Sequence, residues 1–367
     1  MKNRTFAVLA LFILFVFAVS CKWFQSVATN NAANKHLFPF SSGVRGETKW
    51  GYMNGEGKVV IQPQFVAADF FFEGRGRVKA AGKNGVCWGY IDETGKMVIE
   101  PQFQESDPRV WIEDNHENFS EGLAIATIYN SRGKQVVIDK NGQIVFSVPE
   151  GYSIYNKFSE GLVRVSTKGD RMNWGYMDKI GKIVIEPQFF IAHDFHEGLA
   201  AVKMDKYGFI DKTGQMVIKE QFDYVEDFSE GLAAVQVNGK YGFIDRRGEM
   251  VIEPQFSKAG RFSEGLAWVE TGDSIDRKIF YIDKSGKTVI DLPKPTGYSE
   301  ATNFSEGLAW FGNNVIDKTG KTVFTSLSDS RLSQRRRFKN GVSIMTDEKS
   351  LIYYVDKTGK EIKPKFN

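Results

Sequence analysis

Carboxylates at regular spacing are the first side chains in this sequence that could support catalysis. One glutamate recurs in each Phe-x-Glu-Gly motif, and an aspartate opens short turns such as Asp245-Arg-Arg-Gly248. General acid–base catalysis requires two carboxyl groups in one cleft whose pKa values are shifted in opposite directions. Groups that return once per repeat are expected at turns and strand ends, so we predict no catalytic residue. The motif begins at Phe71, Phe119, Phe158, Phe195, Phe228, Phe262 and Phe304.

Two histidines, His193 and His196, are the pair to consider as metal ligands. On an extended connection, side chains three residues apart are expected to point to different faces. A zinc site needs three or four convergent ligands, and no further ligands are evident in the sequence. We therefore predict no metal site. The sequence also has no glycine-rich phosphate loop, so no cofactor is predicted.

Two other motifs have both a functional and a structural interpretation. Arg331 and Arg335-Arg-Arg337 form a basic patch that could contact a phosphate or an acidic head group, although we favour a solvated loop. Asp-Lys-Thr-Gly, which begins at Asp211, Asp317 and Asp356, resembles a phosphorylation motif of ATPases. Its position within each repeat predicts a hairpin turn instead.

The stretch from Phe228 to Phe256 shows the element that positions these residues. Residues 232–237 are short and apolar, as in a half-buried strand, and Asn238-Gly239 is a strong hairpin signal. Residues 241–245 and 250–252 predict two further strands, and Pro254 ends the last because proline cannot donate to a ladder. Each unit is therefore predicted to be a three-stranded antiparallel meander.

Looser copies of the motif at Phe40-Ser-Ser-Gly43 and Phe338-Lys-Asn-Gly341 bring the number of units to nine. One such unit is too small to bury its own face, so it must stack on its neighbours. The predicted fold is all-β, with nine tandem three-stranded antiparallel repeats. We favour a β-propeller-like ring because closure hides sheet edges. An open spiral or solenoid remains the alternative, because propellers typically have about 4–8 blades.

The N-terminus predicts export. Lys2 and Arg4 precede an apolar run over residues 6–19, which is short for a membrane span. Ala18-Val-Ser-Cys21 resembles a bacterial lipobox, which implies cleavage after Ser20 and lipidation of Cys21. An ordinary signal peptide or an uncleaved anchor is the alternative. We thus predict a lipoprotein-type signal peptide at 1–20, a flexible tether at 21–38 and a repeat domain at 39–367.

Composition agrees with an exported globular protein. The net charge of +3 for the whole chain argues against nucleic-acid binding, which requires a basic surface. With Cys21 assigned to the signal, Cys87 is left alone and no internal disulfide is predicted. We expect a monomer that contacts the membrane through its N-terminal lipid.

The centre of each unit carries a recurring Trp-Gly or Tyr-Gly pair, and its surroundings resemble the bacterial WG (KWG) repeat family. The resemblance covers essentially everything after residue 39 and implies exported or surface repeat proteins, often lipoproteins, with no common activity. We expect Trp174 to be buried against the neighbouring unit, with Gly175 allowing close approach of the backbones. The motif residues are Trp50, Gly51, Trp88, Gly89, Trp174, Gly175, Tyr207, Gly208, Tyr241 and Gly242.

Two classes of function follow. The first is a non-catalytic, envelope-anchored binding or scaffold module for proteins or glycans, because tandem repeats offer broad surfaces. We favour this class, together with anchoring at an outer membrane or the cell surface. The alternative is an envelope enzyme or carbohydrate-processing factor with its site in the insertions at 104–118 or 270–279, which interrupt the repeat.

Overall fold

The computed structural model describes residues 36–43, 48–104, 117–131, 133–168, 173–273, 276–295, 300–326, 337–346 and 352–366. The predicted signal peptide, Ser20, Cys21 and nearly all of the predicted tether lie outside these residues. In the described part the chain is all-β, and the sheet pairings within it are antiparallel. No helix of that part is long and apolar enough to cross a membrane.

The strands follow the repeats. Those of predicted units 1 to 3 are β1 (Leu37–Ser42), β2 (Lys49–Asn54), β3 (Val59–Phe65), β4 (Ala67–Phe72), β5 (Arg75–Gly82), β6 (Gly85–Ile91), β7 (Met97–Gln104), β8 (Leu123–Ile128), β9 (Gln135–Asp139) and β10 (Ile144–Ser147). Those of units 4 to 6 are β11 (Tyr152–Ser159), β12 (Leu162–Thr167), β13 (Trp174–Asp178), β14 (Ile183–Phe189), β15 (Ile191–Ala192), β16 (Ala200–Lys203), β17 (Tyr207–Ile210), β18 (Met216–Phe222), β19 (Tyr224–Val225), β20 (Leu232–Val237), β21 (Lys240–Asp245) and β22 (Met250–Phe256). Those of units 7 to 9 are β23 (Lys258–Ala259), β24 (Ala267–Thr271), β25 (Lys278–Ile282), β26 (Thr288–Asp291), β27 (Leu308–Phe311), β28 (Asn314–Asp317), β29 (Thr322–Thr325), β30 (Phe338–Lys339), β31 (Val342–Thr346), β32 (Ile352–Asp356) and β33 (Glu361–Ile362).

The three-strand prediction is wrong for most units, which have four strands. The sheets of units 4 to 7 and of unit 9 each begin with a strand that precedes the Phe-x-Glu-Gly turn. In units 5 to 7 and 9 this strand has only two residues, so sequence alternation could not reveal it. The sheets of units 2 and 3 are joined into one seven-stranded sheet by pairing of β7 with β8.

The first unit has a different register from the predicted one. Phe40 pairs with Gly51, as Val235 of β20 pairs with Gly242. Strand β1 is therefore the counterpart of the second strand of the other units, and Phe40-Ser-Ser-Gly43 is not a Phe-x-Glu-Gly turn. Among the described residues, unit 1 lacks the first strand.

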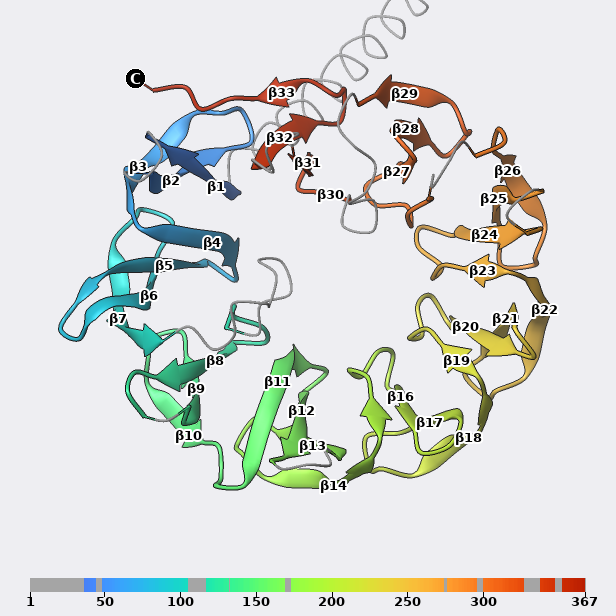
Figure 1. Cartoon of the computed structure of the whole chain (residues 1–367), viewed down its shortest axis with the longest axis horizontal. Helices are drawn as coiled ribbons and strands as arrows, with labels where there is room; N and C mark the ends of the chain where they lie inside the picture. Colours follow the sequence, from blue (N-terminus) through green and yellow to red (C-terminus); the bar gives the residue numbers. More distant parts are fainter. Residues whose placement is uncertain are drawn as a thin grey trace, which may run out of the picture.

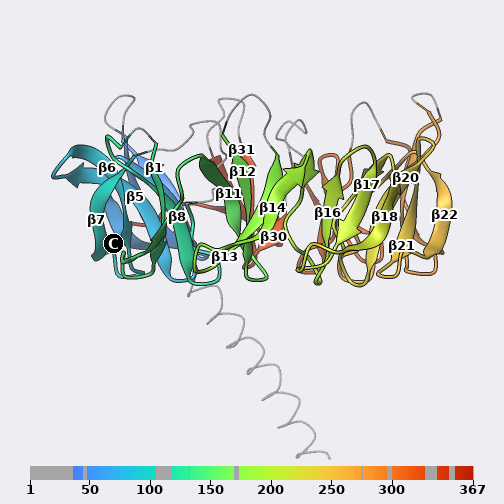
Figure 2. The same cartoon turned by 90° about the horizontal axis from the view of Figure 1, so that it is seen from below.

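The sheets follow one another around a central opening, and the last sheet lies beside the first (Figure 1). The short first strands, such as β19 and β23, lie on the inner side, and the last strands, such as β14 and β22, lie at the perimeter. Seen from the side, the strands stand roughly upright and the molecule is wider than it is tall (Figure 2).

The hydrophobic core lies between consecutive sheets. One cluster joins Phe209 and Ile218 of unit 5 to Val225, Phe228 and Ile244 of unit 6. The motif phenylalanines from Phe119 to Phe304 are at most 2% exposed. Burial of an aromatic side chain is a large stabilising term, so each motif phenylalanine fastens its unit to the preceding one.

The two ends of the chain meet through several contacts. Lys58 and Lys365 form a parallel bridge, flanked by hydrogen bonds from Lys365 N to Gly57 O (2.7 Å) and from Val59 N to Lys365 O (3.2 Å). A buried cluster also joins the first and last sheets, and its members include Phe38, Phe40, Met53, Val59, Val342 and Tyr354.

Candidate functional site

The Phe-x-Glu-Gly glutamates link neighbouring units. The Glu160 carboxylate accepts a hydrogen bond from Gly198 N of the next unit (2.9 Å), and Glu306 accepts from Asn340 N and Gly341 N (2.6 and 2.8 Å). The same link joins every pair of successive units from unit 2 to unit 9. Each glutamate has positive φ, between 50° and 56°, because it and the following glycine form the tight hairpin turn.

A lysine from a following turn completes the link at six of the seven glutamates, whereas the equivalent residue for Glu197 is Arg246. Lys212 Nζ lies 3.0 Å from Glu160 Oε2, and Lys318 Nζ lies 3.0 Å from Glu264 Oε2. Partial burial raises the pKa of Glu160, but the hydrogen bonds from Lys212 and Gly198 outweigh it and lower the pKa overall. The motif serine adds a further hydrogen bond between units: Ser229 Oγ donates to Phe262 O of the next unit (2.7 Å). These carboxylates therefore have structural partners.

The Trp-Gly glycines allow the third and fourth strands of one unit to approach closely. A methyl group at Gly175 would lie 2.2 Å from Ile185 O and 2.6 Å from Pro187 N. The same overlap with the fourth strand occurs at Gly51, Gly89, Gly208 and Gly242. No side chain larger than hydrogen fits at these positions. The close approach that these glycines allow is between two strands of the same unit.

The aromatic partners of these glycines differ in burial. Trp88 is 4% exposed and Tyr207 6%, whereas Trp50, Trp174 and Tyr241 are half-buried. Trp174 packs at the edge of the cluster between units 4 and 5. The expectation that Trp174 is buried is therefore met only in part.

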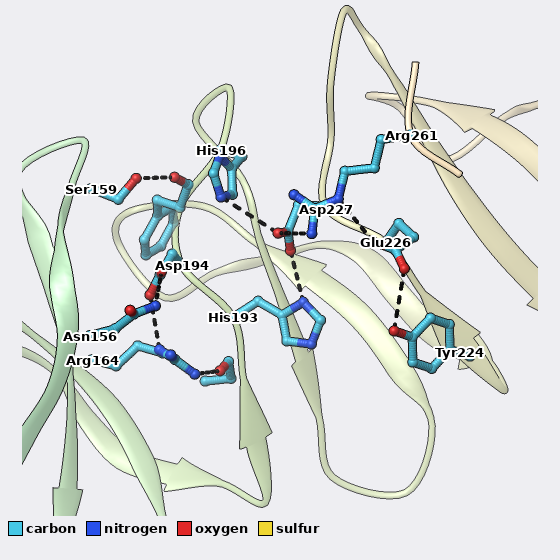
Figure 3. A network of polar contacts seen from close by, with 12 residues as sticks. Asn156, Ser159, Arg164, His193, Asp194, His196, Tyr224, Glu226, Asp227 and Arg261 are labelled. Carbon is cyan, nitrogen blue, oxygen red and sulfur yellow. Dashed lines mark hydrogen bonds and ion pairs between the residues drawn. The ribbon is translucent and has the colours of Figure 1, made fainter. Parts of the chain in front are cut away.

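A group of polar side chains gathers between the first strands of units 4 to 7 and forms the best candidate site (Figure 3). We call it the inner cluster. In units 5 to 7 the two-residue first strand is followed by polar residues just before the motif phenylalanine, and these lie beside a neighbouring unit. The members are Asn156, Arg164, His193, Asp194, His196, Tyr224, Glu226, Asp227 and Arg261.

Asp227 is the centre of the inner cluster. Its side chain is 10% exposed and lies 2.7 Å from His193 Nδ1, 3.5 Å from His196 Nε2 and 2.9 Å from Arg261 Nη2. The two histidines thus converge on one carboxylate, and the expectation that they point to different faces is wrong. An ionised carboxylate only accepts hydrogen bonds, so His193 Nδ1 carries a proton.

Asp194 forms a second centre in the same cluster. Arg164 Nε lies 2.9 Å from Asp194 Oδ1, and Asn156 Nδ2 donates to Asp194 Oδ2. Arg164 Nη1 also donates to Ala192 O (2.9 Å), and its guanidinium lies 5.4 Å from the Trp174 ring centre. The guanidinium is therefore fixed by several contacts.

The pKa values of the two aspartates are shifted in opposite directions. Burial raises the pKa of Asp194 above its ordinary value, although Arg164 opposes this. Burial also acts to raise the pKa of Asp227, but the hydrogen bond from His193 and the charge of Arg261 hold it below its ordinary value. Opposed shifts are typical of acid–base pairs, yet each carboxylate here is held by basic partners, so the arrangement mainly orients charged groups.

Aromatic rings continue the inner cluster. The Tyr207 ring centre lies 6.0 Å from that of His193 and 5.8 Å from that of Tyr224, which lies 6.2 Å from Tyr241. Tyr224 is 38% exposed, and its hydroxyl lies 3.3 Å from Glu226 Oε1. Burial and the nearby Glu226 raise the pKa of Tyr224 to about 12, so it remains a neutral donor.

The sequence contains one signal for this site. Polar residues directly precede the motif phenylalanine at His193-Asp194, at Glu226-Asp227 and at Arg261. Because the short first strands, such as β19 and β23, line the inner side of the molecule, the polar residues that follow them lie close to one another around the opening.

The other residues considered in the sequence analysis do not belong to the inner cluster. Residues 105–116 and 274–275 of the insertions, together with Arg331 and Arg335-Arg336, lie outside the described residues. Cys87 is a free, buried thiol that is 1% exposed. Asp211, Asp317 and Asp356 each accept backbone hydrogen bonds within their own hairpin turns. Over the described ranges, no three His, Cys, Asp or Glu side chains are placed to hold a metal ion.

One solved structure with a TM-score above 0.5 is similar in fold alone, because its sequence identity is low. A crystal structure described as "the eukaryotic initiation factor" has a TM-score of 0.53 and 12% identity, covering 80% of this chain and 86% of that chain. "KlHsv2 with loop 6CD replaced by a Gly-Ser linker" has a TM-score of 0.42 and 9% identity, covering 66% and 91%. No curated protein matches the sequence.

The sequence itself matches a family described as "WG containing repeat". The matched segments are 50–83, 88–108, 174–206, 207–241, 241–273 and 279–314, which together span more than half of the chain. They carry all five Trp-Gly and Tyr-Gly pairs and much of the inner cluster. The chain therefore belongs to the family of WG-repeat proteins.

Proposed function

We propose that this WG-repeat protein is a non-catalytic, envelope-anchored binding module whose inner cluster holds a glycan. The observation that carries the proposal is the convergence of His193, His196 and Arg261 on Asp227 beside the partly exposed Tyr224. Planar polar groups fixed by their neighbours, next to aromatic rings, are typical of ligand sites.

The chemistry of the cluster favours a ligand rich in hydroxyl groups. Asp194, Glu226 and Asp227 are acceptors, while Asn156 and Arg261 supply donors. A hydroxyl group both donates and accepts, so it can use either kind of partner. The side chains of His196 and Arg261 are 41% and 37% exposed and can therefore be reached from solvent.

The proposal includes closure of nine units into a propeller-like ring. The bridge between Lys58 and Lys365 supports it. So does the packing of turn glycines: a methyl at Gly214 would meet Ile185 of the preceding unit, and a methyl at Gly57 would meet Lys363 O and Ile362 of unit 9. The seam between the chain ends thus uses a contact found between the other units.

Anchoring is the second part of the proposal. Cys21 stands at the end of a lipobox-like sequence, and lipidation there would hold the ring at the envelope, with an outer membrane or the cell surface as the favoured location. The mature chain would act as a monomer, since closure satisfies the sheet edges internally.

An array of envelope-type glycans, including peptidoglycan fragments, tests the proposal with the full chain in detergent. We expect binding that Tyr224→Ala weakens at least tenfold. Lys258→Ala changes the corresponding residue of unit 7, which is also exposed, and should alter affinity less than twofold. Absence of glycan binding, or equal binding by Tyr224→Ala, would contradict the proposal.

A further inference from the structure

A pocket of about 320 Å³ lies where units 9, 1 and 2 meet, away from the inner cluster. Its apolar wall includes Phe38, Phe70, Phe72 and Ile344, and its polar lining includes Glu73, Gly74, Glu93, Arg337 and Lys339. Lys339 Nζ lies 4.8 Å from the Phe72 ring centre. A volume near 300 Å³ suits a small ligand.

The pocket lies where unit 1 has no first strand among its described residues. Phe71, the motif phenylalanine of unit 2, is part of the pocket lining. Phe71 is only half-buried, whereas its counterparts from Phe119 to Phe304 are at most 2% exposed. Phe70 and Phe72 are also half-buried, so one end of the gap has an aromatic wall.

The described part of unit 1 places no carboxylate at the turn of unit 2. In units 3 to 9 the motif glycine donates its N–H to the glutamate of the preceding unit, as Gly122 does to Glu73 (2.9 Å) and Gly341 does to Glu306 (2.8 Å). Among the described units, Gly74 has no such partner, and neither does the N–H of Glu73. The turn keeps the geometry of a carboxylate-binding turn, with φ of 50° at Glu73 and 78° at Gly74.

The carbonyl of β1 that faces the gap already accepts a hydrogen bond from unit 9. In unit 6 the first strand donates Glu226 N to Ala234 O (2.9 Å). The counterpart of that acceptor in unit 1 is Pro39 O, which already accepts from the Tyr354 hydroxyl (2.6 Å). The centre of the Tyr354 ring lies 5.5 Å from that of Phe38 and 6.3 Å from that of Phe70, and both of these phenylalanines line the pocket.

We propose that this pocket binds a small carboxylic acid with an aromatic or similar apolar group. The carboxylate accepts hydrogen bonds from Glu73 N and Gly74 N, as the motif glutamates do at the other turns. The apolar group packs on Phe70 and Phe72. Lys339 and Arg337 bring positive charge to the pocket, while Lys140 Nζ lies 3.1 Å from the Glu73 carboxylate and offsets its charge.

The test uses 3-phenylpropionate as the probe and 3-phenylpropanol as its uncharged counterpart. Binding to the full chain in detergent is measured by calorimetry against a detergent blank. We expect the acid to bind at least tenfold more tightly than the alcohol. No detectable binding of the acid at millimolar concentration, or equal binding of the two compounds, would overturn the proposal.

Phe72→Ser is the matched variant, because serine occupies this motif position at Ser120, Ser159 and Ser229. The serine hydroxyl can form the bond to the next unit that Ser120 Oγ makes to Phe158 O (2.8 Å), so the fold is retained. We expect at least tenfold weaker binding of the acid. Phe190→Ser, at an aromatic residue that is 66% exposed and outside the pocket, should leave binding unchanged.

Lys339→Ser supplies a second variant, at the residue of unit 9 whose Nζ lies over the Phe72 ring, and it also introduces the residue common at this motif position. It should weaken the acid more than the alcohol, because it removes a positive charge. Unchanged binding of the acid by both Phe72→Ser and Lys339→Ser would exclude the pocket as the site.

Discussion

The hydroxyl group of Tyr354, near the end of the chain, donates a 2.6 Å hydrogen bond to the carbonyl of Pro39 in the first strand. Equivalent tyrosines make this type of bond between successive units, as Tyr281 does with Thr302 O (2.7 Å). The acceptor in unit 1 lies on β1 because no first strand is described there. The two ends of the chain are thus joined by a contact that the repeat already uses.

Removal of this hydroxyl should destabilise the protein. Tyr354→Phe leaves Pro39 O without its donor and should lower the free energy of unfolding by about 1 kcal/mol. Tyr281→Phe is the matched control inside the array and should cost a similar amount. Chemical denaturation measures both, and a loss at Tyr281 with none at Tyr354 would indicate that the seam does not form.

Burial of the motif tryptophans predicts different costs of truncation. Trp88 is 4% exposed and the Arg77 guanidinium lies 3.8 Å from its ring centre, so Trp88→Ala should cost about 3–5 kcal/mol. Trp174 is half-buried, so Trp174→Ala should cost about 1.5–3 kcal/mol. Equal unfolding midpoints for the two variants would contradict this order.

Acid should weaken the links between units. Burial acts to raise the pKa of Glu160 and Glu264, but hydrogen bonds from Lys212 and Lys318 lower both below the ordinary value of 4.5. A lowered folded-state pKa stabilises the fold above the unfolded value, and this contribution is lost as pH falls through the folded value. The melting temperature should therefore fall as the pH is lowered from about 4.5.

Glu264→Gln isolates one of these links. The variant should melt earlier than the wild type at pH 7 and approach it as the pH falls, because the wild-type carboxylate then becomes neutral as well. A constant difference between the two proteins from pH 7 to pH 3 would show that the charge of Glu264 is not responsible.

The repeat and the strand content could be predicted from sequence because they depend on local signals. Asn238-Gly239 and the Asp-x-x-Gly turns fix hairpins over a few residues, and the structure has strands on both sides of them. The two-residue first strands, such as Tyr224–Val225, could not be predicted because they are too short for a periodic pattern.

The inner cluster was not predicted, because its contacts join different units and its sequence signal has meaning only once the inner strands are known. His193 and Asp227 are 34 residues apart, and their contact depends on how sheets stack rather than on local spacing. The register of unit 1 was missed for a related reason. Phe40-Ser-Ser-Gly43 imitates the motif in sequence, whereas pairing of Phe40 with Gly51 sets its true position.

Lipidation of Cys21 stays a prediction and has a direct test. Cells that produce the full chain should incorporate a palmitate analogue into the wild type, which then partitions into detergent. Cys21→Ser should lose the label because it lacks the acceptor thiol, while Cys87→Ser, at the buried thiol, should keep it. Equal labelling of wild type and Cys21→Ser would contradict the prediction.

The ring and the carboxylate pocket both require that units 1 and 9 meet, and an engineered disulfide tests this most directly. Lys58 and Lys365 are exposed partners in a bridge, so cysteines at both positions should fall within the Cα separation of about 4.4–6.8 Å that a disulfide requires. Lys58→Cys with Lys182→Cys is the control, since Lys182 belongs to unit 4. We expect the first pair to form an intramolecular disulfide, seen as a mobility shift on a non-reducing gel, and the control pair to form none. No intramolecular disulfide in the Lys58–Lys365 pair under oxidising conditions would mean that the chain ends are apart and the array is open.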